Sequence, residues 1–136
     1  MLATRTIVLL NMADQEFDDD LPEGCPPSQA TLGNATFYAA HKDRPPSSSD
    51  FTTAWQRNAF PIGLECNRKS NSVMAGEADA RHLLKLYPTR YRFVSSGAVT
   101  VKHGVWMPTR TLRFASHHSL WVFKGVRMHD IFTTVI

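Results

Sequence analysis

The stretch from Arg81 to Arg127 constrains the fold and the function of this chain more than any other part of the sequence. It carries nine basic side chains and no Asp or Glu, and it holds four of the six histidines. Apolar and aromatic residues run between these charges, a pattern typical of strands with one buried face. The stretch therefore predicts a helix end followed by a sheet with one apolar and one positive face, and a positive face predicts an anionic partner.

The basic character covers most of the chain, whereas its beginning is acidic. Six of the twelve acidic residues lie before Gly24, and from Gly24 onward 14 Lys and Arg face six Asp and Glu. We therefore divide the chain into an acidic, weakly ordered N-terminal segment, residues 1–24, and one basic domain, residues 25–136. The opposite charges predict that the acidic segment folds back over the basic sheet.

Local patterns predict an α+β domain, built mainly from a twisted antiparallel sheet with two short helices in the first half. The first helix is expected at 50–57. The second is expected at 77–87, because apolar residues recur there at helical spacing and Pro88 follows. Strands are expected at 35–41, 67–74, 91–94, 98–102, 105–108, 112–115, 119–123 and 131–135.

Two glycines in the second half predict turns. Gly104 is expected to take a positive φ between the strands at 98–102 and 105–108, which would make them a hairpin. Gly125 is expected to form a second turn after the strand at 119–123.

The two cysteines, Cys25 and Cys66, are too few for a disulfide framework and form no Cys-x-x-Cys pair. Reduced thiols are therefore expected, and a single disulfide stays open as the alternative. The longest apolar run, 7–10, is too short to span a membrane. The sequence therefore favours the cytoplasm and predicts neither a membrane partner nor a cofactor.

Basic and aromatic side chains of the predicted sheet are the candidates for ligand binding. Arg90 and Arg92 flank Tyr91, so both arginines of such a strand face one side and the tyrosine faces the other. Charges for a phosphate backbone and rings for base stacking are what binding of single-stranded nucleic acid requires. The alternative is a solvated sheet face whose charges prevent aggregation. The predicted ligand-binding residues are Arg90, Arg92, Lys102, Arg110, Arg113 and Trp121.

Two adjacent histidines, His117 and His118, are the candidates for catalysis if the protein is an enzyme. Imidazole groups can contact a phosphate or act as general acid and base near neutral pH. Neighbouring strand residues point to opposite faces, so the pair would not share one metal ion, and we predict no metal site. The alternative is one histidine packed beside Trp121 and one exposed to solvent.

A third pattern is the run from Arg68 to Ser72, which places Ser-x-Ser on a strand ahead of the helix expected at 77–87. In this respect the chain resembles the central part of the ADP-ribosyltransferase fold. The resemblance implies a nucleotide-acting transferase with His41, Ser72 and His118 at its site. No Glu follows Glu77, so the usual catalytic Glu has no counterpart, and the resemblance implies the fold more than the activity. The alternative is a plain strand serine behind a solvated basic loop.

These patterns leave three functions open. The favoured one is a binding module whose basic sheet engages an anionic partner, with nucleic acid or a nucleotide preferred. The second is the small nucleotide-acting transferase that the resemblance implies. The third is a protein–protein interaction module that docks an acidic partner, in which removal of residues 1–23 changes the oligomeric state or the affinity. The sequence contains no dinucleotide-binding glycine pattern, phosphate-binding loop, serine-hydrolase motif or zinc-peptidase motif.

Overall fold

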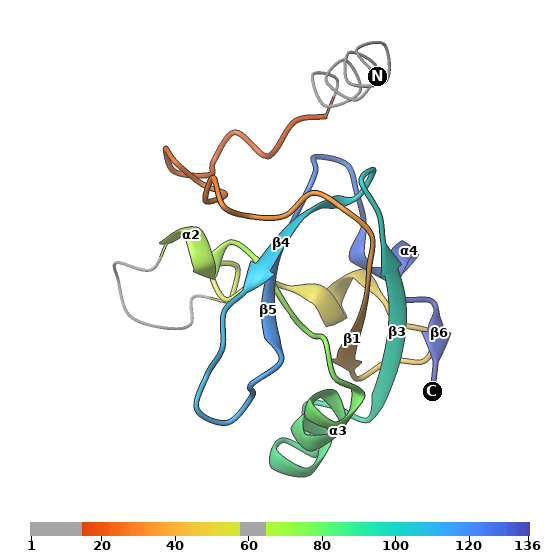
Figure 1. Ribbon diagram of the computed structural model, residues 1–136. Helices are drawn as coiled ribbons and strands as arrows, with labels where there is room; N and C mark the ends of the chain where they lie inside the picture. Colours follow the sequence, from red (N-terminus) through yellow and green to blue (C-terminus); the bar gives the residue numbers. More distant parts are fainter. Residues whose placement is uncertain (1–14, 58–64) are drawn as a thin grey trace.

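The computed structural model describes residues 15–57 and 65–136, and in these ranges it has one six-stranded antiparallel sheet with short helices around it (Figure 1). The strand order is β4-β5-β2-β1-β3-β6. The predicted α+β class with an antiparallel sheet is thereby confirmed. The strands are β1 (Ala35–His41), β2 (Asn71–Met74), β3 (Phe93–Val99), β4 (Gly104–Pro108), β5 (His117–Val122) and β6 (Thr134–Val135). The helices are η1 (Ser48–Phe51, a 3-10 helix), α2 (Glu65–Arg68), α3 (Glu77–Leu86) and α4 (Met128–Ile131).

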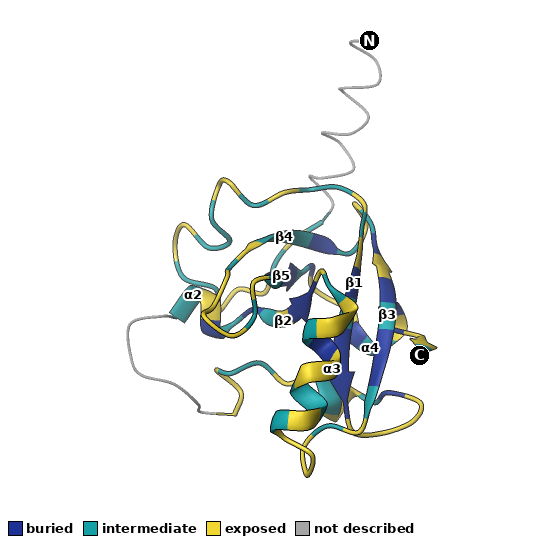
Figure 2. Ribbon diagram, turned by 60° about the horizontal axis from the view of Figure 1, so that its bottom comes forward, coloured by how far each residue is buried: buried dark blue, intermediate teal, exposed yellow. Residues whose placement is uncertain are grey.

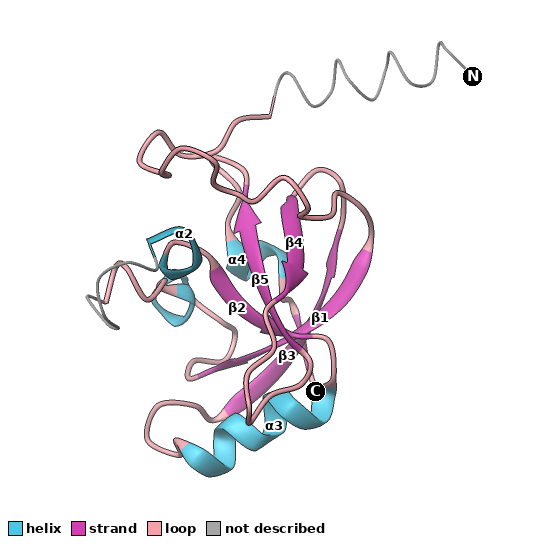
Figure 3. Cartoon of the chain, turned by 60° about the vertical axis from the view of Figure 1, so that its left-hand side comes forward, coloured by secondary structure: helices cyan, strands magenta, loops and turns pink. Residues whose placement is uncertain are grey.

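The sheet opens between its two central strands. β1 and β2 are in register at the single pair Tyr38 and Met74, whereas β1 pairs with β3 over seven residues. β5 in turn pairs with β2 over four residues and with β4 over five. The sheet therefore consists of two wings, β4-β5-β2 and β1-β3-β6, and β4 and β5 lie apart from β3 and β6 in Figure 1. Figure 3 shows the strands from another side, with α3 at one end of the sheet.

One face of the sheet carries the larger part of the core. Phe37, Val73 and Leu120 come from three different strands and pack with Phe132, and all four side chains are buried. Figure 2 shows that the buried residues follow the strands, whereas much of α3 is exposed. Each such side chain stabilises the fold by about 1.5–3 kcal/mol, and together they fix the wings relative to α4.

The other face is covered at one end by α3, where Ala80 packs with Met74 and Val94. The helix begins and ends close to the predicted bounds. Its first turn is tied to the start of β5, because the Asp79 carboxylate accepts hydrogen bonds from the Ser116 hydroxyl at 2.6 Å and the Ser116 N–H at 3.0 Å. These hydrogen bonds lower the pKa of Asp79.

The helix prediction for 50–57 was wrong. Residues 48–51 form the 3-10 helix η1, and a turn follows. The reason is local hydrogen bonding, because the Asp50 carboxylate accepts N–H groups of Ser47 and Lys42, each at 2.9 Å, and thereby closes a loop. Helices also form at 65–68 and 128–131, so they are not confined to the first half of the chain. No helix of the described residues is long and apolar enough to cross a membrane.

The predicted hairpin around Gly104 was also wrong. β3 runs unbroken from Phe93 to Val99, and β4 pairs with β5 instead of β3. Gly104 is required there for close approach, since a Cβ atom would collide with the carbonyl oxygen of Trp121. Gly125 lies in the expected turn and takes a positive φ, 85°. The segments expected as strands at 112–115 and 131–135 are a loop and the end of α4 followed by β6, respectively.

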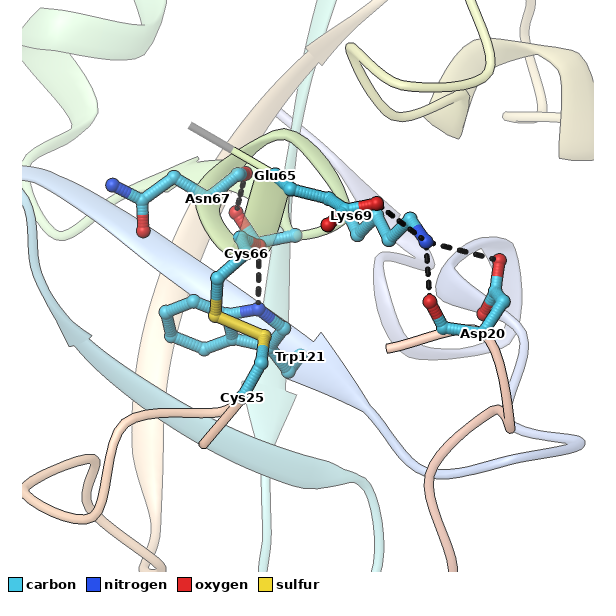
Figure 4. Close-up of a disulfide and its surroundings, with 8 residues drawn as sticks. Asp20, Cys25, Glu65, Cys66, Asn67, Lys69 and Trp121 are labelled. Atoms are coloured by element: carbon cyan, nitrogen blue, oxygen red, sulfur yellow. Dashed lines mark hydrogen bonds and ion pairs between the residues drawn. A yellow bond between two sulfur atoms is a disulfide. The ribbon is translucent and has the colours of Figure 1, made fainter. Parts of the chain in front are cut away.

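Cys25 and Cys66 form a disulfide, which corrects the expectation of reduced thiols (Figure 4). The two residues are 41 positions apart, so their spacing alone did not predict contact. A buried indole brings them together, because Trp121 donates its N–H to the carbonyl oxygen of Cys66 at 3.0 Å. The hydrogen bond holds α2 against β5, and the disulfide ties α2 to the chain around Cys25.

The acidic segment contacts the domain over its described part, residues 15–24, although it forms no helix or strand there. The ring of Phe17 lies 4.9 Å from that of Phe123. The carbonyl oxygen of Glu16 accepts the N–H of Lys124 at 2.6 Å. The described part of this segment therefore contacts the domain at the end of β5.

Candidate functional site

A cavity of about 580 Å³ lies where the two wings diverge. β1 and β2 contribute to its wall, and β5 contributes His117 and Ser119. Segments outside the sheet complete the wall: residues 50–54, the end of α2, residues 90–91 before β3 and residues 109–111 after β4. A volume of this size is typical of pockets for small ligands, roughly 300–1,000 Å³.

Positive charge dominates the wall of this cavity, and we call it the arginine cleft. Its four arginines are Arg57, Arg68, Arg90 and Arg110. Asp50 is the one carboxylate among the described residues that line it. Burial works to raise the pKa of Asp50, but hydrogen bonds from backbone N–H groups outweigh it and lower that pKa. The Asp50 charge is thus held by backbone amides, and the four arginines give the cleft a net positive charge.

Arg68 is the most unusual of the four, because only 8% of its surface is exposed. Its Nε atom is buried and has no hydrogen-bond partner among the described residues. The guanidinium carbon lies 4.9 Å from the ring centroid of Trp55, which shields one side of the group. A buried guanidinium without an anion is costly. The wall of the cleft therefore carries a mostly buried cation with one unsatisfied donor.

Arg90 and Tyr91 form a second part of the wall, just before β3. The Arg90 guanidinium lies over the Tyr91 ring, 5.0 Å from its centroid. Burial raises the pKa of Tyr91, so its hydroxyl keeps its proton at neutral pH. Arg90 and Tyr91 therefore line one cavity ahead of β3, which corrects the expectation that they face opposite sides of a strand.

His117 occupies the start of β5 with a defined ring orientation. Its Nδ1 atom lies 2.9 Å from the carbonyl oxygen of Thr109, which can only accept a hydrogen bond. In the neutral ring, Nδ1 therefore carries the proton and Nε2 carries the free lone pair. Burial lowers the pKa of His117 more than this hydrogen bond raises it, and His118 lowers it further. His117 is thus neutral at pH 7 and presents a base.

His118 points to the other face of β5, as the alternation of strand residues predicts. Its ring centroid lies 5.1 Å from that of Phe37 and 6.0 Å from that of Trp106. Its Nδ1 atom lies 2.7 Å from the carbonyl oxygen of Ser116. His118 packs beside the core and does not line the arginine cleft.

The cleft brings together only some of the residues that the sequence singled out. Arg90, Arg110 and His117 line it. Trp121 is 1% exposed and anchors Cys66 through its indole N–H. The remaining predicted ligand contacts, which do not line the cleft, are Arg92, Lys102 and Arg113.

Sequence reasoning missed Arg57 and Arg68. Arg68 stands beside Lys69, and the pair resembles an ordinary solvated loop in the sequence. Arg68 is buried by α2 and by Trp55, which lies 13 positions earlier in the chain. The backbone N–H of Trp55 donates to the Arg68 carbonyl oxygen at 2.9 Å. No spacing in the sequence indicates that contact.

The residues implied by the ADP-ribosyltransferase resemblance lie in three different environments. His41 is fully buried, and its ring nitrogens lie 2.7 Å from the Ser95 hydroxyl and 2.7 Å from the Asp43 carbonyl oxygen. Ser72 lines the arginine cleft, whereas His118 packs on the opposite face. The three side chains therefore do not share one cavity.

Within residues 15–57 and 65–136, no group of three or more His, Cys, Asp and Glu side chains is arranged to hold a metal ion. Comparisons of the chain with protein-family models, with curated proteins and with solved structures find no match. The geometry of the arginine cleft is therefore the basis for a functional assignment.

Proposed function

We propose that the arginine cleft binds a phosphorylated nucleotide unit, and that the protein is a binding module for single-stranded nucleic acid. The observation that carries this proposal is Arg68, a buried guanidinium in the cleft wall whose Nε atom has no partner in the described part of the chain. A phosphate oxygen is the anion that best fits it. Guanidinium groups bind phosphate through two parallel N–H donors and lose little hydration when buried.

The other arginines support a chain of phosphates rather than one. Arg57, Arg90 and Arg110 lie on three separate segments around the same cavity. Side chains spread in this way can follow a phosphate backbone, which is how single strands are held without regard to sequence. The single lining carboxylate, Asp50, is already held by backbone amides and does not oppose an anion.

The apolar part of the wall supports a base beside the phosphate. Phe51, Leu83 and Tyr91 line the same cavity as the arginines. A base can stack on a ring only when it has left its duplex, and each stacked base adds roughly 1–3 kcal/mol. The combination favours a single strand over a double helix.

The disulfide is informative about the cellular compartment of the protein. The sequence favoured the cytoplasm, but disulfides persist in oxidising compartments and are rare in the cytosol. The Cys25–Cys66 bond therefore supports an oxidising compartment. Thiol labelling of the denatured protein from its native source tests this, because two reactive thiols would restore the cytoplasmic prediction.

The test of the proposed function is the binding of fluorescent single-stranded RNA, single-stranded DNA and duplex DNA across a salt series. We expect both single strands to bind more tightly than the duplex, with affinity that falls as salt rises. The variant Arg90→Gln/Arg110→Gln should lose most of this affinity. Its matched control is Arg92→Gln/Arg113→Gln, which removes the same charge from outside the cleft and should lose little.

Two results would contradict the proposal. Equal losses in the two double variants would indicate a sheet-wide electrostatic surface in place of the cleft. Absence of binding at low salt, together with tight binding of polyglutamate, would indicate a module that docks acidic proteins.

A further inference from the structure

We propose, on the basis of the proposed function, that the arginine cleft cleaves RNA, with His117 as the general base that activates the 2′-hydroxyl for attack on the adjacent phosphodiester. The inference depends on which described groups of the cleft wall can accept a proton and on where the nucleophile comes from. It names a substrate class, RNA, and a reaction, internal transesterification.

His117 is the group suited to accept the proton. The Asp50 carboxylate is held by backbone N–H groups of Ser47 and Lys42, each at 2.9 Å. Tyr91 keeps its hydroxyl proton, because burial raises its pKa. The imidazole of His117 is neutral, and Nε2 is its free lone pair. General bases of this kind work best when they are unprotonated near the working pH.

The ring of His117 is also held in place. Thr109 contacts Nδ1 through both its carbonyl oxygen and its hydroxyl, each at 2.9 Å. The Thr109 hydroxyl in turn lies 2.9 Å from the Ser119 hydroxyl, which comes from the same face of β5. These contacts fix the tautomer and the orientation, as a partner on the second ring nitrogen does in other catalytic histidines. Thr109 is thereby a positioning residue for His117.

The cleft suits a substrate that carries its own nucleophile. The Ser119 hydroxyl in the described wall of the cleft lies against Thr109, not against the His117 Nε2 atom. An RNA strand carries a 2′-hydroxyl next to each phosphodiester, so one base and several cations are sufficient for its cleavage. DNA lacks this hydroxyl and would bind without reaction.

The step balances without a further reactant. The Nε2 atom of His117 takes the proton of the 2′-hydroxyl, and the 2′-oxygen forms a bond to phosphorus. The bond from phosphorus to the 5′-oxygen breaks, and that oxygen takes a proton from water. The products are a 2′,3′-cyclic phosphate and a 5′-hydroxyl end, and the imidazolium returns its proton to water.

Arg68 would stabilise the negative charge that develops during the reaction. Negative charge increases on the phosphate oxygens during the attack, and a fixed guanidinium beside them stabilises that charge more than it stabilises the ground state. Arg68 is held by its burial and by Trp55, so it needs no rearrangement for this role. Arg90 and Arg110 are more exposed and are suited to the flanking phosphates.

The experiment compares an RNA of roughly ten nucleotides, within the range of single-strand site sizes, with the same sequence as DNA. Binding is measured by fluorescence anisotropy, and cleavage by gel and mass spectrometry. We expect both strands to bind and only the RNA to be cut, with a cyclic phosphate on the product. His117→Asn keeps a donor for the Thr109 carbonyl but removes the base, so cleavage should fall on the order of 10²–10⁴-fold, far more than the affinity falls.

The matched control is His118→Asn, on the neighbouring position and the opposite face, which should keep the cleavage rate. A circular dichroism spectrum and an unfolding curve establish that both variants are folded. If both strands bind and RNA stays intact, the ribonuclease inference is wrong and the proposed function stands. If cleavage is the same in His117→Asn, the inference is also wrong. If neither strand binds, the proposed function fails with it.

Discussion

Arg68 and Lys69 are neighbours at the end of α2, and they differ in how their charges are neutralised. Both place the charge over the ring of Trp55, 4.9 Å and 4.4 Å from its centroid. The Lys69 ammonium lies 3.7 Å from the Asp20 carboxylate and 3.6 Å from that of Glu65 (Figure 4). The Arg68 Nε atom has no partner in the described part of the chain. Lys69 is thus paired with carboxylates of its own protein, whereas Arg68 is the cation that we propose binds a phosphate.

The same difference separates two cavities of similar size. The arginine cleft, about 580 Å³, contains Arg68, whereas a cavity of about 530 Å³ contains Lys69 together with Asp18 of the acidic segment. Phe51 lines both cavities. The acidic segment therefore contributes Asp18 to the cavity of Lys69, whereas Asp50 is the carboxylate among the described residues that line the arginine cleft. Within residues 15–24, the segment does not line the arginine cleft.

The largest expected effect is loss of the link that holds the acidic segment beside α2. Cys25→Ala/Cys66→Ala opens a loop of 41 residues, and chain entropy alone predicts a loss of about 4 kcal/mol of stability. The free energy of unfolding in urea measures it. A loss below about 1 kcal/mol, far under the entropic value, would mean that the segment and α2 are held together without the disulfide. The ion pairs of Lys69 would then be the contacts that hold the segment beside α2.

The next effect separates the two cations directly. Arg68→Met should lower the affinity for a short single-stranded DNA at least about tenfold, equivalent to about 1.4 kcal/mol. The reason is that it removes the buried cation that we propose binds a phosphate. Its free energy of unfolding should stay the same or rise, because an unpartnered buried charge is removed. Anisotropy and urea unfolding measure the two quantities.

Lys69→Met is the matched variant, with the same new side chain one position along. It should leave the affinity for DNA within about twofold, a difference of roughly 0.4 kcal/mol. It should lower stability by up to about 1 kcal/mol, since the Asp20 and Glu65 side chains are 67% and 44% exposed and can be solvated. Equal behaviour of the two variants would remove the distinction between a structural cation and a ligand-binding one.

The sequence predicted what depends on local pattern. The strand at 35–41 and the helix at 77–87 follow from side-chain periodicity and from Pro88, and both are found within one residue of the expected bounds. The separation of His117 and His118 onto two faces follows from strand geometry alone. The long contacts could not be predicted in this way, because the Trp121–Cys66 hydrogen bond and the Trp55–Arg68 contact join residues far apart in the chain.

The errors have the same origin. The sequence showed a glycine between two apolar runs and indicated a hairpin, but the partner of β4 is decided by packing against β5. The candidate site was half predicted for a related reason. Arg90 and Arg110 were found because they lie in the acid-free stretch, whereas Arg68 lies outside it and is placed by tertiary structure.

A smaller effect concerns the pH dependence of stability, and it compares His117 with His103. Burial lowers the pKa of both below the ordinary value of 6.5. Well above pH 6.5 both are neutral in the folded and the unfolded chain. As the pH falls from 6.5 toward the folded-state pKa, the unfolded chain takes up protons that the folded chain does not, so stability falls.

His117→Asn should therefore flatten the curve of unfolding free energy against pH below 6.5, and His103→Asn should remove a separate share of the slope. Urea unfolding at a series of pH values measures both. Asp50 and Asp79 have pKa values lowered from 3.8, so their effects fall at more acidic pH and do not overlap. An unchanged slope in His117→Asn would mean that this ring is solvated and is not a held base.

The smallest effect is expected at the edge of the acidic segment. Asp19 and Lys124 form an ion pair of 3.8 Å, but 91% and 55% of their side chains are exposed. Water and salt screen such a pair, so Asp19→Asn should change stability by at most about 0.5 kcal/mol.

Asp20, in the same segment, differs from Asp19 because it lies beside the mostly buried Lys69. Asp20→Asn should therefore lower the free energy of unfolding more than Asp19→Asn does in the same urea titration. The reason is that the contribution of each carboxylate depends on how deeply its partner cation is buried, not on the number of charges. A larger cost for Asp19→Asn would mean that general attraction to the basic domain, and not the Lys69 contact, holds the segment in place.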